Sequence, residues 1–201
     1  MSGGFDWMYS EVVKDHFVNP RNILDDEDTF QADGRGVVGN IKCGDQMLIV
    51  IKVADGIIAD CKWKTYGCAS AIASTSILSE AAIGMELEKA YHIKPKDIAD
   101  RLGGLPENKI HCSVLGDKAL RAAIEDYYEK TNQNDKIKEE EAVIICQCMN
   151  VTDKDIEAAV KDGARTYADL QHRTKAGTVC GQCRQESEEL LHQYTHIYDI
   201  N

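Results

Sequence analysis

Two closely spaced cysteine pairs in the last third of the chain restrict its fold more than any other pattern. Cys146 and Cys148 are separated by one residue, and Cys180 and Cys183 by two. Two such pairs can form a cage of four thiolates, which suits either a zinc ion or a [2Fe–2S] cluster, because both accept tetrahedral sulfur. Zinc sites more often use two Cys-x-x-Cys turns. The Cys-x-Cys half therefore favours the iron–sulfur cluster, while structural zinc stays open.

Three further cysteines are candidates for a second centre. Cys43 is followed by a glycine and Asp45, Cys68 follows a glycine, and Cys112 is preceded by His111. We expect the three sulfurs to converge on a metal ion or an iron–sulfur cluster, with the aspartate and the histidine beside them. The alternative is that these cysteines are separately buried, as free cysteines commonly are.

Composition excludes several classes of function. The chain has 201 residues, eight cysteines and a formal net charge of −11, which argues against a nucleic-acid partner because phosphate contacts need a basic surface. No window approaches the apolar length of a membrane helix, and residues 1–7 lack the features of a secretory signal. We therefore expect a cytoplasmic protein in which cysteines serve metal or redox chemistry rather than disulfides.

The first part of the chain predicts a helix followed by a β-meander. Amphipathic spacing predicts a helix over 6–17, and turn-rich acidic residues predict a loop over 23–35. Strands are expected at 37–41, 47–53 and 57–66. Asp55-Gly56 predicts a tight hairpin between the last two, because both central residues of a type I′ turn need positive φ.

Apolar and polar residues alternate along the third expected strand. Cys61 would share one face with other apolar residues and behave as a buried small hydrophobe. The expected apolar face contains Ile57, Ala59, Cys61 and Trp63.

Helices are expected after this sheet. One runs from Cys68 to about residue 80, and free N–H groups at its start favour a thiolate there. Helical spacing continues to about Lys130, with His111 and Cys112 at the start of a long helix. The remaining histidines are expected to be surface or capping residues; they are His16, His92, His172, His192 and His196.

A polar segment at 131–141 is the expected linker. Beyond it, Thr152 and Thr166 each begin a capping-box pattern, and a third helix follows Cys183. The pattern therefore predicts an α+β fold followed by a small helical unit.

These motifs resemble known families. The motifs after the linker, Cys146-Gln147-Cys148-Met149-Asn150-Val151-Thr152 and Gly177-Thr178-x-Cys180-Gly181-Gln182-Cys183, are similar to the bacterioferritin-associated-ferredoxin-type [2Fe–2S] domain. Those before it resemble the U-type (IscU-like) cluster scaffold: Asp15-His16-Phe17-x-Asn19-Pro20-Arg21-Asn22, Cys43-Gly44-Asp45, the run from Gly67 to Ser74, and His111-Cys112-Ser113. This order resembles NifU, without the third, C-terminal domain that full-length NifU carries.

The resemblance implies an architecture. Residues 1–130 would be an IscU-like scaffold domain with a three-stranded antiparallel sheet and packed helices. Residues 131–141 would be the linker, and 142–201 a small all-α [2Fe–2S] domain.

The resemblance also assigns residues. Cys43, Cys68 and Cys112 match the ligands of a labile cluster, Asp45 the aspartate that makes it labile, and His111 an alternative ligand. Cys112 also matches the position that accepts a persulfide. The four cysteines of the first-mentioned pairs match the ligands of a permanent [2Fe–2S] cluster.

The implied function is assembly of an iron–sulfur cluster, and the protein would not be an enzyme. Sulfur would come from a cysteine desulfurase, and a transient [2Fe–2S] or [4Fe–4S] cluster, or an iron or zinc ion, would occupy the first site. Clusters would pass to apo iron–sulfur proteins, with an electron donor as a further partner and a homodimer as the assembly. A zinc-dependent persulfide relay and a [2Fe–2S] electron-transfer protein remain alternatives.

Overall fold

The computed structural model describes residues 9–39, 46–104, 111–138 and 142–198, and for 111–114 it describes the backbone alone. The chain forms two compact units, Met1–Ile137 and Lys138–Asn201. Among the described residues, no helix combines the length and the apolar character needed to cross a membrane.

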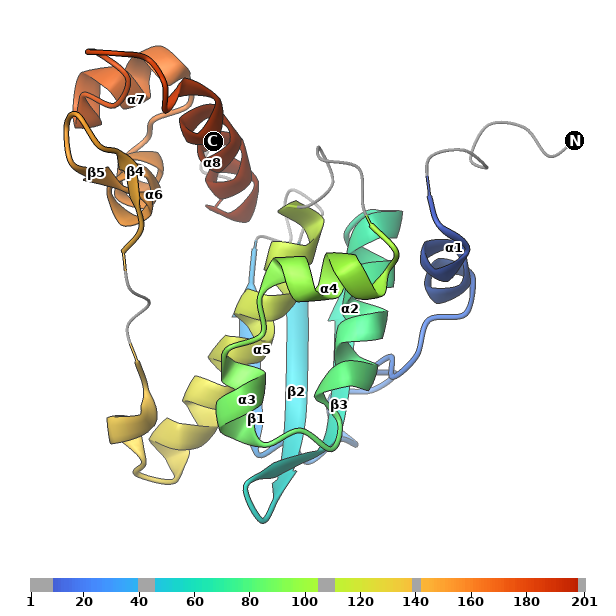
Figure 1. Cartoon of the computed structure of the whole chain (residues 1–201). Helices are drawn as coiled ribbons and strands as arrows, with labels where there is room; N and C mark the ends of the chain where they lie inside the picture. The colour runs from blue at the N-terminus through green and yellow to red at the C-terminus, as the bar shows by residue number, and fades with distance from the viewer. Residues whose placement is uncertain (1–8, 40–45, 105–110, 139–141, 199–201) are drawn as a thin grey trace, which may run out of the picture. The chain divides into compact units, whose positions relative to one another are not determined.

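The first unit is built on a three-stranded antiparallel sheet with the order β1-β2-β3 (Figure 1). Its strands are β1 (Gly34–Val38), β2 (Met47–Ala54) and β3 (Ile57–Thr65). The predicted antiparallel meander is confirmed, but β1 begins at Gly34 rather than Val37. Residues 40 and 41 of the expected first strand lie outside the described residues.

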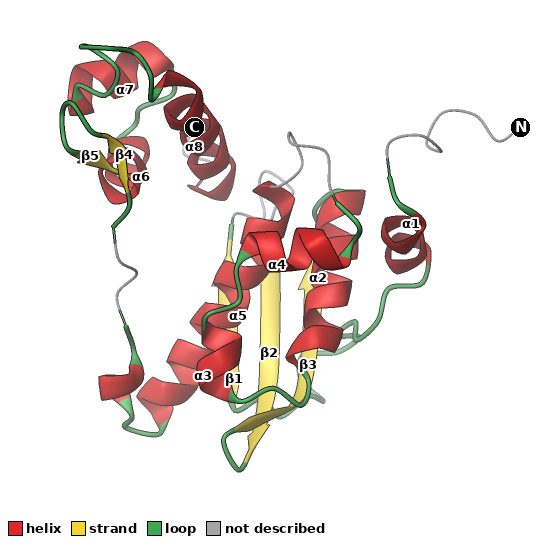
Figure 2. Ribbon diagram, viewed as in Figure 1, coloured by secondary structure: helices red, strands yellow, loops and turns green. Residues whose placement is uncertain are grey.

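Helices cover one face of this sheet and a loop covers the other. Figure 2 shows the helices between residues 69 and 130, in red, in front of the yellow strands. On the opposite face Leu24, Leu48 and Val50 form a small buried cluster with Phe30. Because both faces are covered, the first five residues of β2 are all buried, and the strand reads as a continuous apolar run. The helices of this unit are α1 (Glu11–Val18), α2 (Ala69–Ala82), α3 (Leu87–Tyr91), α4 (Pro95–Arg101), α5 (His111–Lys130) and the 3-10 helix η3 (Asn134–Lys136).

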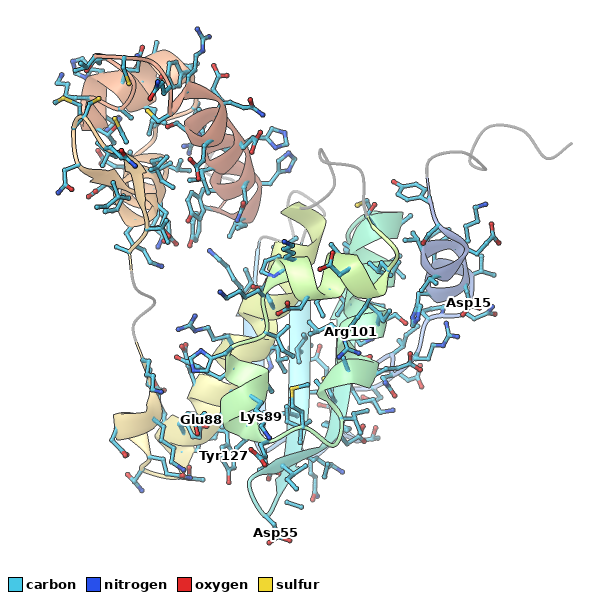
Figure 3. The ribbon with its side chains drawn as sticks, in the orientation of Figure 1. Asp15, Asp55, Glu88, Lys89, Arg101 and Tyr127 are labelled. Carbon is cyan, nitrogen blue, oxygen red and sulfur yellow. The ribbon has the colours of Figure 1, made fainter. Side chains whose placement is uncertain are left out.

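The β2–β3 hairpin confirms the predicted turn and corrects the predicted faces. Asp55 (φ 52°) and Gly56 (φ 76°) both have positive φ, and Asp55 lies at the tip of the hairpin (Figure 3). Lys52 pairs with Asp60, whereas the next residue of β2 pairs with Ile58, so Ala59 is left over as a bulge. Cys61 and Trp63 are buried as predicted, but Ile57 and Ala59 are exposed and Ile58 is buried. The bulge reverses the alternation, so the expectation of one continuous apolar face was wrong.

Two glycines of β1 let α5 lie close to the sheet. A Cβ placed on Gly34 would be 2.1 Å from the Ala123 carbonyl oxygen, and one on Gly36 would be 2.0 Å from that of Ala119. These are backbone atoms that cannot rotate away. The position of α5, and of the segment at its start, therefore depends on the absence of these two side chains.

Helix α1 is held to α2 through a buried histidine. His16 is 5% exposed, and its Nδ1 lies 2.8 Å from Ser76 Oγ, which also accepts the Arg21 N–H at 2.9 Å. The expectation that His16 is a surface or capping residue was wrong. The predicted start of the helix was also early, because α1 begins at Glu11 with Ser10 as its N-cap.

In the second unit, the described residues form three helices, α6 (Asp153–Lys161), α7 (Tyr167–Thr174) and α8 (Arg184–Tyr198). Thr152 and Thr166 form the predicted capping boxes, with Asp155 and Asp169 respectively. The predicted helical unit is confirmed, and a short antiparallel ladder, β4 (Ile144–Cys146) with β5 (Val151–Thr152), is added to it. Its core contains Ile156, Val160, Ala164, Leu170, Ala176, Leu191, Tyr194 and Ile197.

The expected linker is structured in its first part. Residues 131–137 fall within the first unit, where Gln133 N–H donates to the Tyr128 carbonyl at 2.7 Å and Lys136 Nζ lies 5.5 Å from the Tyr128 ring centroid. Residues 139–141 lie outside the described residues.

Candidate functional site

The β4–β5 hairpin positions the first cysteine pair of the second unit. Cys146 is the last residue of β4 and pairs with Val151. The chain reverses between them, and Asn150 takes the left-handed conformation that the reversal needs (φ 50°). Cys148 lies in this turn and is exposed, whereas Cys146 is buried.

The second pair lies in the turn that starts α8. Gly181 has φ 73°, and Arg184 N–H donates to its carbonyl at 3.1 Å. This turn leaves Cys180 exposed and places Cys183, which is buried, directly before the first residue of α8.

The four sulfurs meet as two pairs. Cys148 Sγ lies 3.5 Å from Cys180 Sγ, and the Cys183 thiol hydrogen-bonds to Cys146 Sγ. Each pair joins the hairpin to the start of α8, and one pair is exposed while the other is buried. Among the described residues, no three His, Cys, Asp or Glu side chains gather around a point suited to one metal ion.

In each pair, the surroundings lower the pKa of one cysteine and raise the pKa of the other. The Gly177 N–H, together with those of Met149 and Cys148, lowers the pKa of Cys146, whereas burial raises the pKa of Cys183.

In the exposed pair, the Gln182 N–H and the Cys148 thiol lower the pKa of Cys180, and the same thiol contact raises the pKa of Cys148. Backbone donors therefore already face sulfur in the arrangement that a ligated thiolate needs.

Gly177 is central to this arrangement. It has φ 69°, and a Cβ there would lie 1.9 Å from the Tyr167 hydroxyl oxygen and 3.7 Å from Cys183 Sγ. The Tyr167 hydroxyl and the Cys183 sulfur thus border the same small space above the glycine. The buried hydroxyls of Tyr167 and Ser187 have no hydrogen-bond partner of ordinary geometry among the described residues.

These residues fit a two-iron cluster better than a single ion. A zinc ion gathers four sulfurs at one point, whereas the irons of a [2Fe–2S] cluster each take two cysteines. Two sulfurs on one tetrahedral metal are about 3.8 Å apart, from bonds of about 2.3 Å. The 3.5 Å between the sulfurs of Cys148 and Cys180 is close to that spacing. Unpartnered hydroxyls beside the buried pair are donors that bound sulfur could use.

In the first unit the structure describes one of the expected ligands completely. Cys68 is exposed and is the N-cap of α2, as predicted, without a side-chain capping bond. Its sulfur therefore stands at a helix start, where the helix dipole favours negative charge.

Cys43 and Asp45 lie outside the described residues, as do the side chains of His111 and Cys112.

The described backbone nevertheless brings three segments to one end of this unit. The Gln46 carbonyl accepts the Thr65 hydroxyl at 2.9 Å, which places the start of β2 beside the segment that leads to Cys68. Thr75 of α2 donates to Met47 Sδ at 3.5 Å, and a Cβ on Gly116 of α5 would lie 3.3 Å from its hydroxyl oxygen. The first turns of α2 and α5 lie at the same end of the sheet (Figure 1).

Two residues beside the cysteines of the second unit, Ser187 and Tyr167, were not predicted from the sequence. Ser187 lies four positions after Cys183. Because this spacing puts two side chains on one helical face, it could have indicated that the serine lies beside the cysteine. Tyr167 and the buried role of His16 carry no such local signal, because their partners are distant in sequence.

Comparisons with known proteins agree with this division of the chain. The family model for the NifU-like N terminal domain matches residues 8–134, and that for the BFD-like [2Fe-2S] binding domain matches residues 144–193.

Curated relatives fall into two groups. Iron-sulfur cluster assembly scaffold protein IscU 1 of Archaeoglobus fulgidus is 53% identical over 132 residues, covering 66% of this chain and 84% of the relative. IscU of Escherichia coli (strain K12) is 50% identical over 123 residues, covering 61% and 95%. Nitrogen fixation protein NifU of Trichormus azollae is 38% identical over 194 residues, covering 92% of this chain and 63% of the relative.

The IscU matches cover 66% and 61% of this chain, whereas the NifU match covers 92% and so extends through both units. This chain spans 63% of that NifU relative's length. The chain therefore belongs to the family of the NifU-like N-terminal domain, which is joined here to a BFD-like [2Fe–2S] binding domain.

Proposed function

We propose that the chain is a scaffold that assembles an iron–sulfur cluster on its first unit and passes it to apo-proteins. The observation that carries the proposal is the 53% identity over 132 residues with a protein named as an assembly scaffold. The function proposed is binding and transfer rather than turnover of a small molecule, so the chain is not an enzyme.

The transferred cluster would be held by Cys43, Cys68 and Cys112, with Asp45 or His111 as the fourth ligand. The exposed N-cap position of Cys68 supports this assignment, as does the meeting of the starts of β2, α2 and α5 at one end of the unit (Figure 1). A carboxylate is a harder ligand than a thiolate, so it binds soft iron less firmly and allows the cluster to leave. The cargo would be a [2Fe–2S] or [4Fe–4S] cluster, with a single iron or zinc ion as another occupant.

Cys112 is the proposed sulfur acceptor. Its thiolate would attack the outer sulfur of a persulfide on a cysteine desulfurase, forming a new S–S bond while the bond within that persulfide breaks. The desulfurase cysteine would leave as a thiolate, and the proton would stay on the transferred sulfur. Release of that sulfur as sulfide consumes two electrons, which an electron donor such as a thiol or a reduced iron–sulfur protein would supply.

Cys146, Cys148, Cys180 and Cys183 would hold a permanent [2Fe–2S] cluster, which supplies one-electron redox chemistry when bound. The pairing of the sulfurs and the backbone N–H groups aimed at Cys146 support this assignment over zinc. We further propose that the scaffold works in the cytoplasm, as its composition indicates, and that it is a homodimer, by analogy with the IscU-like scaffolds.

Reconstitution tests the assembly role. The full chain would be incubated with iron, cysteine and a cysteine desulfurase, then mixed with an apo-ferredoxin whose own cluster reports transfer. Cys68→Ala should abolish transfer, whereas Cys61→Ala should preserve it, because Cys61 is fully buried in the core and has its pKa raised to about 12 by burial. Stoichiometric zinc that resists chelation would favour a persulfide relay. Transfer that is unaffected by Cys68→Ala would contradict the proposal.

A further inference from the structure

Binding of a cluster through four cysteines does not require the buried hydroxyls beside Cys183, so their position needs a separate explanation. We infer that Tyr167 and Ser187 are positioning residues that donate hydrogen bonds to the cysteine sulfur of the bound cluster at its buried end, and so raise its reduction potential. This inference rests on the proposed [2Fe–2S] cluster of the second unit.

Tyr167 is held where its hydroxyl faces the site. It is the first residue of α7, whose start is fixed by the Thr166 capping box. Arg184 lies over its ring, with the guanidinium carbon 5.0 Å from the ring centroid. The hydroxyl occupies the space above Gly177 that a methyl group would fill, and that space is bordered by Cys183 Sγ.

Ser187 approaches the same sulfur from α8. Its N–H donates to the Cys183 carbonyl at 2.9 Å, so it lies one helical turn beyond the cysteine. The residue is 0% exposed, and its hydroxyl lies beside the Cys183 sulfur. A serine completely buried beside a sulfur has no water to satisfy it, which makes that sulfur its natural acceptor.

The metal-free chain explains why these hydroxyls are unpartnered. A neutral cysteine thiol is only a weak hydrogen-bond acceptor. Binding of a metal centre requires the thiolate, whose lone pairs and charge accept hydrogen bonds much more strongly. The two hydroxyls are thus placed for a ligated sulfur rather than for a thiol.

Hydrogen bonds to a ligand sulfur change the reduction potential of the cluster. Reduction adds one negative charge, which the cluster shares with its cysteine sulfurs, so each donated hydrogen bond stabilises the reduced state more than the oxidised state. Hydrogen bonds to sulfur and solvent exposure are established controls on the potential of such clusters. Here both hydroxyls lie at the buried Cys146 and Cys183 end, whereas the Cys148 and Cys180 end is exposed.

The test is a redox titration of the full chain, treated with a chelator so that only the retained cluster contributes. Tyr167→Phe and Ser187→Ala should each raise the ratio of oxidised to reduced cluster about three- to tenfold at a fixed potential, which is a fall of about 30–60 mV for one electron. Ser187→Thr keeps a hydroxyl and should therefore have a reduction potential close to that of the wild-type chain. Visible circular dichroism would confirm that each variant still holds the cluster.

Two control substitutions remove hydroxyls that serve other groups. Tyr198 bonds to Glu157, and the Thr195 hydroxyl bonds to the Leu191 carbonyl, so Tyr198→Phe and Thr195→Val should leave the potential unchanged. Potentials equal to wild type in both Tyr167→Phe and Ser187→Ala, with the cluster intact, would overturn this inference alone. A wild-type chain that retains no [2Fe–2S] cluster would overturn the proposed cofactor as well.

Discussion

Alanine at Gly177 should loosen the second unit more than alanine at Gly181, although both glycines have nearly the same backbone conformation. Their φ angles are 69° and 73°, and an L-residue in this left-handed region costs about 1–2 kcal/mol. This part of the effect is common to the two variants and cancels when they are compared.

The difference comes from the space around each position. The added methyl would lie 1.9 Å from the Tyr167 hydroxyl oxygen and 3.2 Å from its Cζ at Gly177, whereas nothing lies within 4 Å at Gly181. Tyr167 must therefore move, and forcing a packed group aside costs about 1–3 kcal/mol. We expect Gly177→Ala to lose about 2–5 kcal/mol in total and Gly181→Ala about 1–2 kcal/mol. The gap corresponds to about a five- to 150-fold difference in local opening.

Hydrogen exchange measured by mass spectrometry on the metal-free full chain would give both values. Peptides covering β4, β5 and α7 report the second unit directly, which tryptophan fluorescence would not, because both tryptophans, Trp7 and Trp63, lie in the first unit. Equal increases in exchange for the two variants would refute the close approach of Tyr167 to Gly177.

Three further predictions concern the first unit. Burial lowers the pKa of His16 below 6.5, so its contribution to stability is complete above pH 6.5 and is lost as the pH falls from there through the folded-state pKa. The loss is at most about 1.4 kcal/mol per pH unit, and His16→Asn should flatten it in urea titrations followed by Trp63 fluorescence. Gly36→Ala should cost about 3 kcal/mol or more, since backbone of α5 blocks the methyl; a change below 1 kcal/mol in the same titration would exclude that packing. Asp45→Ala should slow loss of the reconstituted cluster to a chelator, and equal or faster loss would count against the carboxylate as the weak ligand.

Local patterns predicted the regular elements well. Capping boxes at Thr152 and Thr166, the Asp55-Gly56 turn and the start of α2 at Cys68 all depend on residues within a few positions of one another. Such patterns can be recognised from the sequence alone, because the groups that hydrogen-bond to each other are close together in the chain.

Features that depend on distant partners could not be predicted in this way. The bulge at Ala59 arises from pairing with β2 and shifts which residues face the core. His16 is buried against α2, where its ring nitrogen contacts Ser76, and Tyr167 reaches the four cysteines only through the fold around Gly177. The cysteine spacing predicted the candidate ligands of the second unit, but the arrangement of their sulfurs as one buried and one exposed pair could be seen only in the tertiary structure.

We propose above all that a single chain holds two clusters, a transferable one on its first unit and a permanent one on its second. Release of iron and sulfide from the reconstituted full chain into a chelator, followed over time, tests it most directly. We predict two phases, with the fast phase removed by Cys68→Ala and the slow phase removed by Cys146→Ala. A single phase, or a fast phase that persists in Cys68→Ala, would contradict the account.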